Sequence, residues 1–166
     1  IHCTITRQMA SRISSFREFL SFWSDKQEIR QIWFSFFTPQ VGSHAQEIVP
    51  PRLKERVLGE LQRLRSSFPK LYLPDRLIRS YRNPPASPEE CIFARTTACF
   101  SSDLATPVSP CQLGGNPDCA QCGCMASAGL KALADYRLLG ALPLRTLYEG
   151  SDRIGKLLAR RSAERS

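Results

Sequence analysis

The sequence contains no apolar run long enough to cross a membrane, which takes about 20 residues as a helix. Its richest apolar patch, residues 29–38, is shorter and is interrupted by Arg30, Gln31 and Ser35. No basic stretch followed by an apolar one marks a signal peptide, and the first residue is Ile1 rather than Met. We therefore expect a cytoplasmic chain without a membrane partner that begins inside a longer protein, with a processed mature protein as the alternative.

Acidic residues are few relative to basic ones. Asp and Glu number 15 against 23 Lys and Arg, which gives a net charge of +8. Charge of this sign permits nucleic-acid binding. However, the basic residues show neither interleaved aromatics nor the pattern of a recognition helix. The sequence therefore favours a solvated basic surface, and we expect no nucleic-acid partner.

The cysteines lack the even count and wide spread of a secreted disulfide framework. There are seven, and six of them lie in one segment: Cys91, Cys99, Cys111, Cys119, Cys122 and Cys124. The remaining one, Cys3, lies in a strand-like stretch and is expected to pack as a small apolar residue. This clustering favours metal binding in a reducing compartment.

Strand-like and helix-like segments alternate through the first half of the chain. Residues 2–7, 29–38 and 71–73 have the composition of strands. Apolar residues at helical spacing follow each of them, after Ser11, after Pro50-Pro51 and after Pro74. Strands that alternate with helices predict an α/β fold with parallel strands. Three such units correspond to half of a barrel or to a small open sheet.

A proline-rich linker over residues 84–90 divides this α/β part, residues 1–83, from a cysteine-rich extension over residues 91–166. Within the extension we expect a hairpin that turns at residues 105–107 and pairs residues 96–104 with 108–111. Two helices are expected after it, at residues 126–136 and 151–161, the second capped by Ser151.

The spacing of the cysteines suits a metal centre. Cys119 and Cys122 form a CxxC, in which one tight turn directs two thiolates to one point. The hairpin would bring Cys91 or Cys99 back beside Cys111. Four thiolates suit either a structural zinc ion or a [4Fe–4S] cluster. Zinc commonly uses two CxxC-like pairs, and the second pair is missing here, so the spacing favours iron–sulfur.

Together these features resemble the C-terminal part of radical S-adenosylmethionine enzymes that carry a SPASM- or twitch-like extension. In that family a cysteine precedes a hairpin and a second one ends it, as Cys91 and Cys111 do. The resemblance implies that residues 1–83 are the last three units of a partial (β/α)6 TIM-like barrel. It also implies an auxiliary [4Fe–4S] cluster in the extension. The ligands stay open among the six clustered cysteines, because Cys99 and the close pair Cys122 and Cys124 depart from the family pattern.

The resemblance also implies parts that these residues do not contain. The family's CxxxCxxC motif, which holds the catalytic [4Fe–4S] cluster, is absent from the sequence. The full protein would use that cluster and S-adenosylmethionine to abstract hydrogen from an unknown small-molecule or peptide substrate. A reductant such as ferredoxin or flavodoxin would supply the electron.

Contacts to S-adenosylmethionine are expected from Thr6 and Arg7, at the end of the first strand. Ser35 and Thr38, late on the second strand, are candidates for the same cavity. The isolated histidines, His2 and His44, are expected to be structural. The alternative function is a non-catalytic basic α/β module with a structural zinc ion bound by four cysteines.

Overall fold

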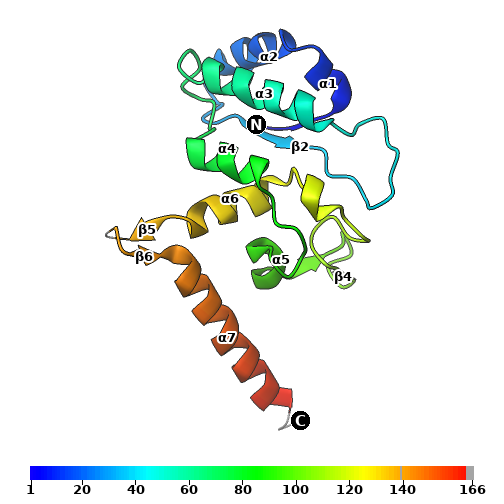
Figure 1. Ribbon diagram of the computed structural model, residues 1–166, viewed down its shortest axis with the longest axis vertical. Coiled ribbons are helices and arrows are strands. Elements are labelled where there is room, and N and C mark those ends of the chain that lie inside the picture. The colour runs from blue at the N-terminus through cyan, green and yellow to red at the C-terminus, as the bar shows by residue number, and fades with distance from the viewer. Residues whose placement is uncertain (139, 164–166) are drawn as a thin grey trace.

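The computed structural model describes residues 1–138 and 140–163, and its first half alternates strands with helices (Figure 1). The elements of this half are β1 (His2–Ile5), α1 (Arg7–Ser11), α2 (Ser15–Ser24), β2 (Trp33–Phe36), α3 (Pro51–Leu64) and α4 (Asp75–Arg82). β1 and β2 pair in parallel, with Ile5 opposite Phe36. Ile32, just before β2, forms a further parallel bridge with Leu71. The predicted mixed α/β fold is thereby confirmed.

The second half contains short elements and one long helix. These are α5 (Ile92–Thr96), β3 (Cys99–Phe100), β4 (Pro107–Val108), a 3-10 turn η1 (Cys119–Gln121), α6 (Met125–Ala134), β5 (Arg137–Leu138), β6 (Leu142–Pro143) and α7 (Leu144–Ala163). β3 pairs antiparallel with β4, and β5 with β6. α7 extends away from the rest of the molecule (Figure 1). Over residues 1–138 and 140–163, no helix has the length and apolarity needed to span a membrane.

Helices cover one face of the β1–β2 pair. Phe34 of β2 packs against Phe16 and Phe19 of α2 at ring-centroid distances of 5.7 and 5.6 Å. α3 begins at Pro51, where proline fits the first turn, and it buries Val57, Leu61 and Leu64 of the expected stripe, together with Leu58, in the same core, while Leu53 of that stripe is only partly buried. Ala128 of α6 belongs to this core as well, so the extension and the α/β part share one apolar interior.

The opposite face of the pair is polar. His2, Thr4 and Ser35 lie on it, and the Ser35 hydroxyl is 3.0 Å from His2 Nε2 and 3.1 Å from the Thr4 hydroxyl. Side chains alternate between the two faces of a strand. The same two strands therefore contribute to the helix-covered core on one face and carry these polar side chains on the other, where His2 and Thr4 are exposed and Ser35 is buried.

Several expected elements differ from those observed. In the part of the chain that the structure describes, the strands form separate two-stranded sheets and no closed barrel. The third strand is reduced to the bridge at Leu71, because Pro69 and Pro74 flank it and proline cannot donate a ladder hydrogen bond.

Two helix starts were also wrong. Ser11 ends α1 instead of capping the next helix, because its hydroxyl donates to the Arg7 carbonyl at 2.8 Å. The last helix starts at Leu144 rather than after Ser151, directly after the β5–β6 hairpin. The Leu144 amide donates a hydrogen bond to the carbonyl of Tyr136, the residue before β5.

Tyr81 of α4 joins three elements through one hydroxyl. Its side chain is 1% exposed, and its hydroxyl donates to the Phe34 carbonyl at 2.6 Å and lies 3.2 Å from Met125 Sδ of α6. Its ring meets Phe36 edge-on at 5.5 Å. Burial raises the pKa of this phenol far above its usual value, so it stays a donor. The hydroxyl thus links β2, α4 and α6.

We predict that Tyr81→Phe lowers the free energy of unfolding by about 1–2 kcal/mol, because a buried carbonyl loses its donor. Urea unfolding measures the change. Tyr72→Phe is the matched control, since Tyr72 is 42% exposed and only stacks on Trp33. Equal stabilities of the two variants would show that the Tyr81 hydroxyl does not hold these elements together.

Candidate metal centre

Five of the six clustered cysteines line one small cavity. They are Cys91, Cys111, Cys119, Cys122 and Cys124. The remaining lining is mostly apolar, with Phe93, Leu113 and three prolines among its members. The cavity encloses about 20 Å³, little more than one water molecule needs. An organic ligand would not fit there, and the thiols themselves form much of the wall.

The segment over residues 111–124, called the cysteine loop below, is held beside the carboxyl end of β2 by hydrogen bonds of its backbone. The Phe36 amide donates to the Gly123 carbonyl at 3.0 Å, and the Gly123 amide donates to the Thr38 hydroxyl at 2.9 Å. Farther along, the Val41 amide donates to Asn116 and the Asp118 amide donates to Pro39, both at 2.8 Å. The loop therefore continues the edge of the parallel strand pair.

Gly123 makes this close approach feasible. It is buried, and a Cβ atom there would lie 2.3 Å from the Phe36 carbonyl oxygen and 2.4 Å from the Phe36 Cβ. No side chain can occupy that space without moving the backbone. The glycine thus fixes its two neighbours, Cys122 and Cys124, at the wall of the cavity.

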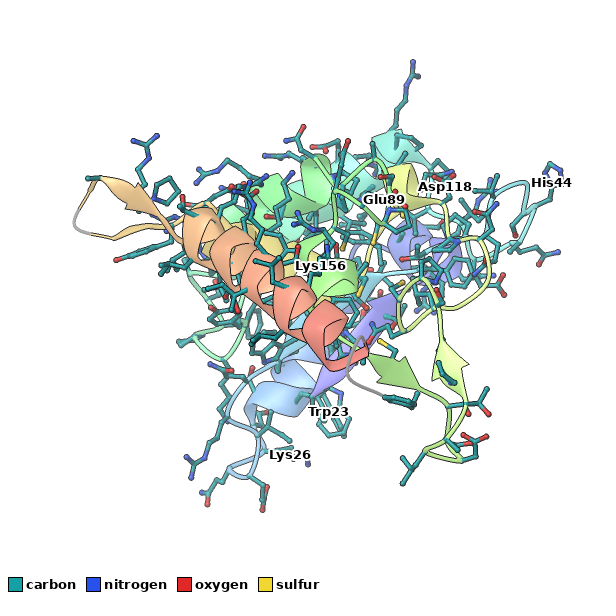
Figure 2. All side chains as sticks on the ribbon, turned by 90° about the horizontal axis from the view of Figure 1, so that it is seen from below. Trp23, Lys26, His44, Glu89, Asp118 and Lys156 are labelled. Carbon is teal, nitrogen blue, oxygen red and sulfur yellow. The ribbon has the colours of Figure 1, made fainter. Side chains whose placement is uncertain are left out.

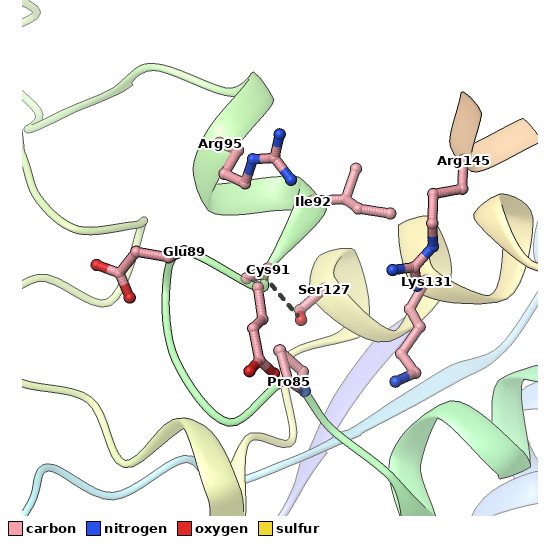
Figure 3. Close-up of a pocket in the computed structure, with 9 residues that line it drawn as sticks. Pro85, Glu89, Cys91, Ile92, Arg95, Ser127, Lys131 and Arg145 are labelled. Carbon is pink, nitrogen blue, oxygen red and sulfur yellow. Dashed lines mark hydrogen bonds between the residues drawn. The ribbon is translucent and has the colours of Figure 1, made fainter. Parts of the chain in front are cut away.

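Cys91 enters the cavity from the start of α5. Its sulfur lies 3.2 Å from the buried hydroxyl of Ser127 on α6 (Figure 3). Both residues also line a second pocket of about 280 Å³, around which Arg95, Lys131 and Arg145 are arranged (Figure 3). Cys91 therefore separates the thiol cavity from a charged pocket that opens to solvent.

Cys124, like Cys91, lines both the thiol cavity and a neighbouring space. Its sulfur accepts a hydrogen bond from the Gln112 side-chain amide at 3.1 Å. Cys124 and Gln112 also line an open groove of about 450 Å³, together with four polar residues from β1, β2 and the segment after β2, namely His2, Thr4, Ser35 and Thr38. This groove contains no Asp, Glu, Lys or Arg in its lining.

The thiols affect one another electrostatically. Burial raises the pKa of Cys119 to about 11, and negative charge on Cys122, Cys91 or Cys111 would raise it as well. Burial also raises the pKa of Cys122 and of Cys124. The amides at the start of α6 and the Thr38 hydroxyl act in the opposite direction on these two. Several neighbouring thiolates need a cation between them, and binding that cation displaces their protons.

The other predicted site residues lie apart from the cavity. Cys99 is on β3 and is not among the cavity residues. Cys3 packs partly buried against the core, as expected, and burial raises its pKa. Thr6 and Arg7 lie just past the end of β1, where Thr6 precedes α1 and the Arg7 amide donates to Glu47. His44 is exposed and projects from the periphery (Figure 2).

Zinc ions and [4Fe–4S] clusters hold their thiolate ligands at different spacings. Four sulfurs around one zinc ion, each about 2.3 Å from it, lie about 3.8 Å from one another. Within the described ranges, no three Cys, His, Asp or Glu side chains are arranged to hold a single ion. A [4Fe–4S] cluster binds each thiolate at a different iron, so its ligands stand farther apart. The five thiols around one cavity are donors that either kind of centre accepts.

The sequence did not indicate Ser127 and Gln112, which support the cysteines, because they form no motif with the cysteines in the sequence. It indicated Thr38 only as a candidate for the S-adenosylmethionine cavity, whereas Thr38 lines the thiol cavity. Only Gly123, between two cysteines, carried a signal, because a glycine inside a ligand loop often marks a close backbone approach.

We predict that Gly123→Ala lowers the free energy of unfolding by about 3 kcal/mol, because the added methyl group collides with the Phe36 backbone. Gly129→Ala is the control. It lies within α6 with nothing within 4 Å of the added atom, and alanine there should stabilise the helix by up to about 1 kcal/mol. Chemical denaturation of both variants measures the contrast. Similar stabilities would refute the tight docking of the cysteine loop.

Comparisons with known proteins do not assign this site. No protein-family model matches the chain, and no similar curated protein or solved structure is found. The function of the cavity therefore has to be argued from its residues.

Proposed function

We propose that the thiol cavity binds an auxiliary [4Fe–4S] cluster and that the chain is the C-terminal part of a radical S-adenosylmethionine enzyme. One observation carries the first half of this proposal. Five cysteines from residues 91–124 line a single apolar cavity at the carboxyl end of a parallel strand pair. Ligand sites in folds with parallel strands concentrate at that end.

The chain's own residues supply what such a site needs. Cys91, Cys111, Cys119, Cys122 and Cys124 provide one thiolate more than four irons require. Ser127 and Gln112 contact the sulfurs of Cys91 and Cys124 at 3.2 and 3.1 Å, which orients those side chains. The surrounding apolar residues limit the access of water. When bound, the cluster would offer one-electron chemistry next to the neighbouring groove.

The barrel part of the proposal is supported by the strand arrangement. Parallel segments at β1, β2 and Leu71 have helices on one face and an open polar groove at the other. In the proposed enzyme the groove would hold substrate beside Cys124. Because its lining contains no Asp, Glu, Lys or Arg, it suits an uncharged part of a small molecule or a peptide. Thr6 and Arg7 stay the candidates for contacts to S-adenosylmethionine.

The radical chemistry itself belongs to residues outside this sequence. The full protein would contain a CxxxCxxC motif for the second [4Fe–4S] cluster and would bind S-adenosylmethionine. It would work in the reducing cytoplasm with ferredoxin or flavodoxin as electron donor. The reaction would be hydrogen abstraction from a substrate that the residues described here do not identify.

A structural zinc site in a non-catalytic basic module is the second candidate. It is favoured by the all-cysteine donor set, which zinc also accepts. The sequence contains one CxxC rather than the two such pairs that zinc commonly uses, which favours the cluster.

We predict that anaerobic reconstitution with iron and sulfide gives a brown protein with about four irons per chain. Cys119→Ser and Cys122→Ser should each reduce bound iron at least severalfold, because each removes a thiolate from the cavity. Cys99→Ser is the control and should load fully, since Cys99 does not line the cavity. Iron and sulfide analysis together with electron paramagnetic resonance of the reduced protein measure the loading.

Stoichiometric zinc in a colourless protein that does not take up iron would exclude the cluster and support the second candidate. Full iron loading of Cys119→Ser and Cys122→Ser would show that the cavity is not the binding site.

A further inference from the structure

Lys54 of α3 is a partly buried cation without an acidic partner. Its ammonium lies over the ring of Phe36, 5.3 Å from the centroid. Neither a hydrogen bond nor an ion pair joins its Nζ to any residue in the described part of the chain. The adjacent Glu55 pairs with Arg82 instead, at 2.9 Å.

Such a position is unfavourable unless a negative charge lies nearby. Moving an ammonium group out of water is costly, and an aromatic face recovers only part of the loss. Burial accordingly lowers the pKa of Lys54. Negative charge on Cys122, and to a smaller extent on Glu55, would raise it. Lys54 also lines a pocket with Ala120 and Gln121, the two residues between Cys119 and Cys122, so the CxxC turn lies beside it.

Phe36 connects Lys54 to this cysteine. Gly123 lies against the Phe36 backbone and Cβ, and the Phe36 amide donates to the Gly123 carbonyl. Cys122 directly precedes Gly123, so the same residue supports the ammonium and the cysteine loop. The Thr38 hydroxyl contacts this loop as well, through the Gly123 amide.

Cations elsewhere around the cavity have other environments. Arg95, beside Cys91, pairs with Asp152 at 2.8 Å, and Arg145 is 3.7 Å from Asp135. Lys131 lines the pocket on the far side of Cys91, and the carboxylates of Glu89 and Glu90 line the same pocket. Among these groups, Lys54 combines burial, the lack of a carboxylate partner and proximity to a cavity cysteine.

We propose that Lys54 is the charge partner of the bound cluster at its Cys122 corner and that it raises the cluster's reduction potential. This inference rests on the proposed function. Reduction adds one electron from a low-potential one-electron donor and forms or breaks no bond. It makes the cluster more negative by one charge. A nearby fixed cation stabilises the reduced form more than the oxidised form, especially where water is excluded.

The test compares three variants after anaerobic iron–sulfide loading. Lys54→Met removes the charge, Lys54→Arg keeps it, and Lys26→Met is the matched control. Lys26 likewise lies over an aromatic ring, 4.8 Å from the Phe22 centroid, but Phe22 is exposed and Lys26 does not line the pocket that Lys54 shares with Ala120 and Gln121. A potentiometric titration with dithionite, followed by electron paramagnetic resonance, gives each reduction potential.

At a fixed solution potential, Lys54→Met should lower the ratio of reduced to oxidised cluster about tenfold, which corresponds to about 59 mV for one electron. Lys54→Arg and Lys26→Met should remain close to the unchanged protein. A loaded Lys54→Met protein whose potential equals that of Lys26→Met overturns the inference about Lys54. Failure of the unchanged protein to load a cluster instead overturns the proposed function.

A second measurement covers the case in which Lys54→Met does not retain the cluster. Urea unfolding of the metal-free proteins should then show Lys54→Met to be at least as stable as the unchanged chain, because a buried uncompensated charge is gone. That result, with loading retained in Lys54→Arg, supports the charge partnership. A metal-free Lys54→Met protein that is clearly less stable, with loading also lost in Lys54→Arg, assigns Lys54 a packing role and overturns the inference.

Discussion

The edge of β2 that faces away from β1 organises most of the chain. Three different segments satisfy its backbone groups in succession. The Ile32 amide donates to Lys70, the Phe34 carbonyl accepts the Tyr81 hydroxyl, and the Phe36 amide donates to Gly123. Buried backbone groups need partners, so this edge cannot be covered without all three segments. One short strand thereby fixes the third β segment, α4 and the cysteine loop relative to one another.

The last of these contacts brings the candidate chemistry to the end of the strand. Because Gly123 has no side chain, the loop approaches the Phe36 backbone closely enough for a hydrogen bond. Its two neighbouring cysteines then have different surroundings. Cys122 lies toward Lys54 and Thr38, whereas Cys124 separates the thiol cavity from the uncharged groove. A cluster held here would be exposed to a fixed cation on one side and to a ligand site on the other.

Sequence patterns predicted the regular elements well and the site only in part. The apolar stripe of α3 was found because it repeats at helical spacing, and the strand at β2 because it is rich in aromatic and apolar residues. The five-residue helix α5 was missed, since so short a helix has no periodicity to detect and is stabilised by tertiary packing. Clustering identified six cysteine candidates, but sequence spacing alone could not show that Cys99 lies on β3, outside the cavity.

Lys54 illustrates what a sequence alone cannot reveal about such a site. In the sequence it is one cation among 23 and belongs to a basic helix whose charges indicate a solvated surface. Only the fold brings it over Phe36. The Phe36 backbone also hydrogen-bonds the cysteine loop, which lies in the second half of the chain. A partly buried cation without a carboxylate partner implies a negative charge nearby, and neutral thiols do not supply one. Thiolates bound to a metal centre would supply it, so under the proposed function Lys54 and the cysteines compensate each other's charge.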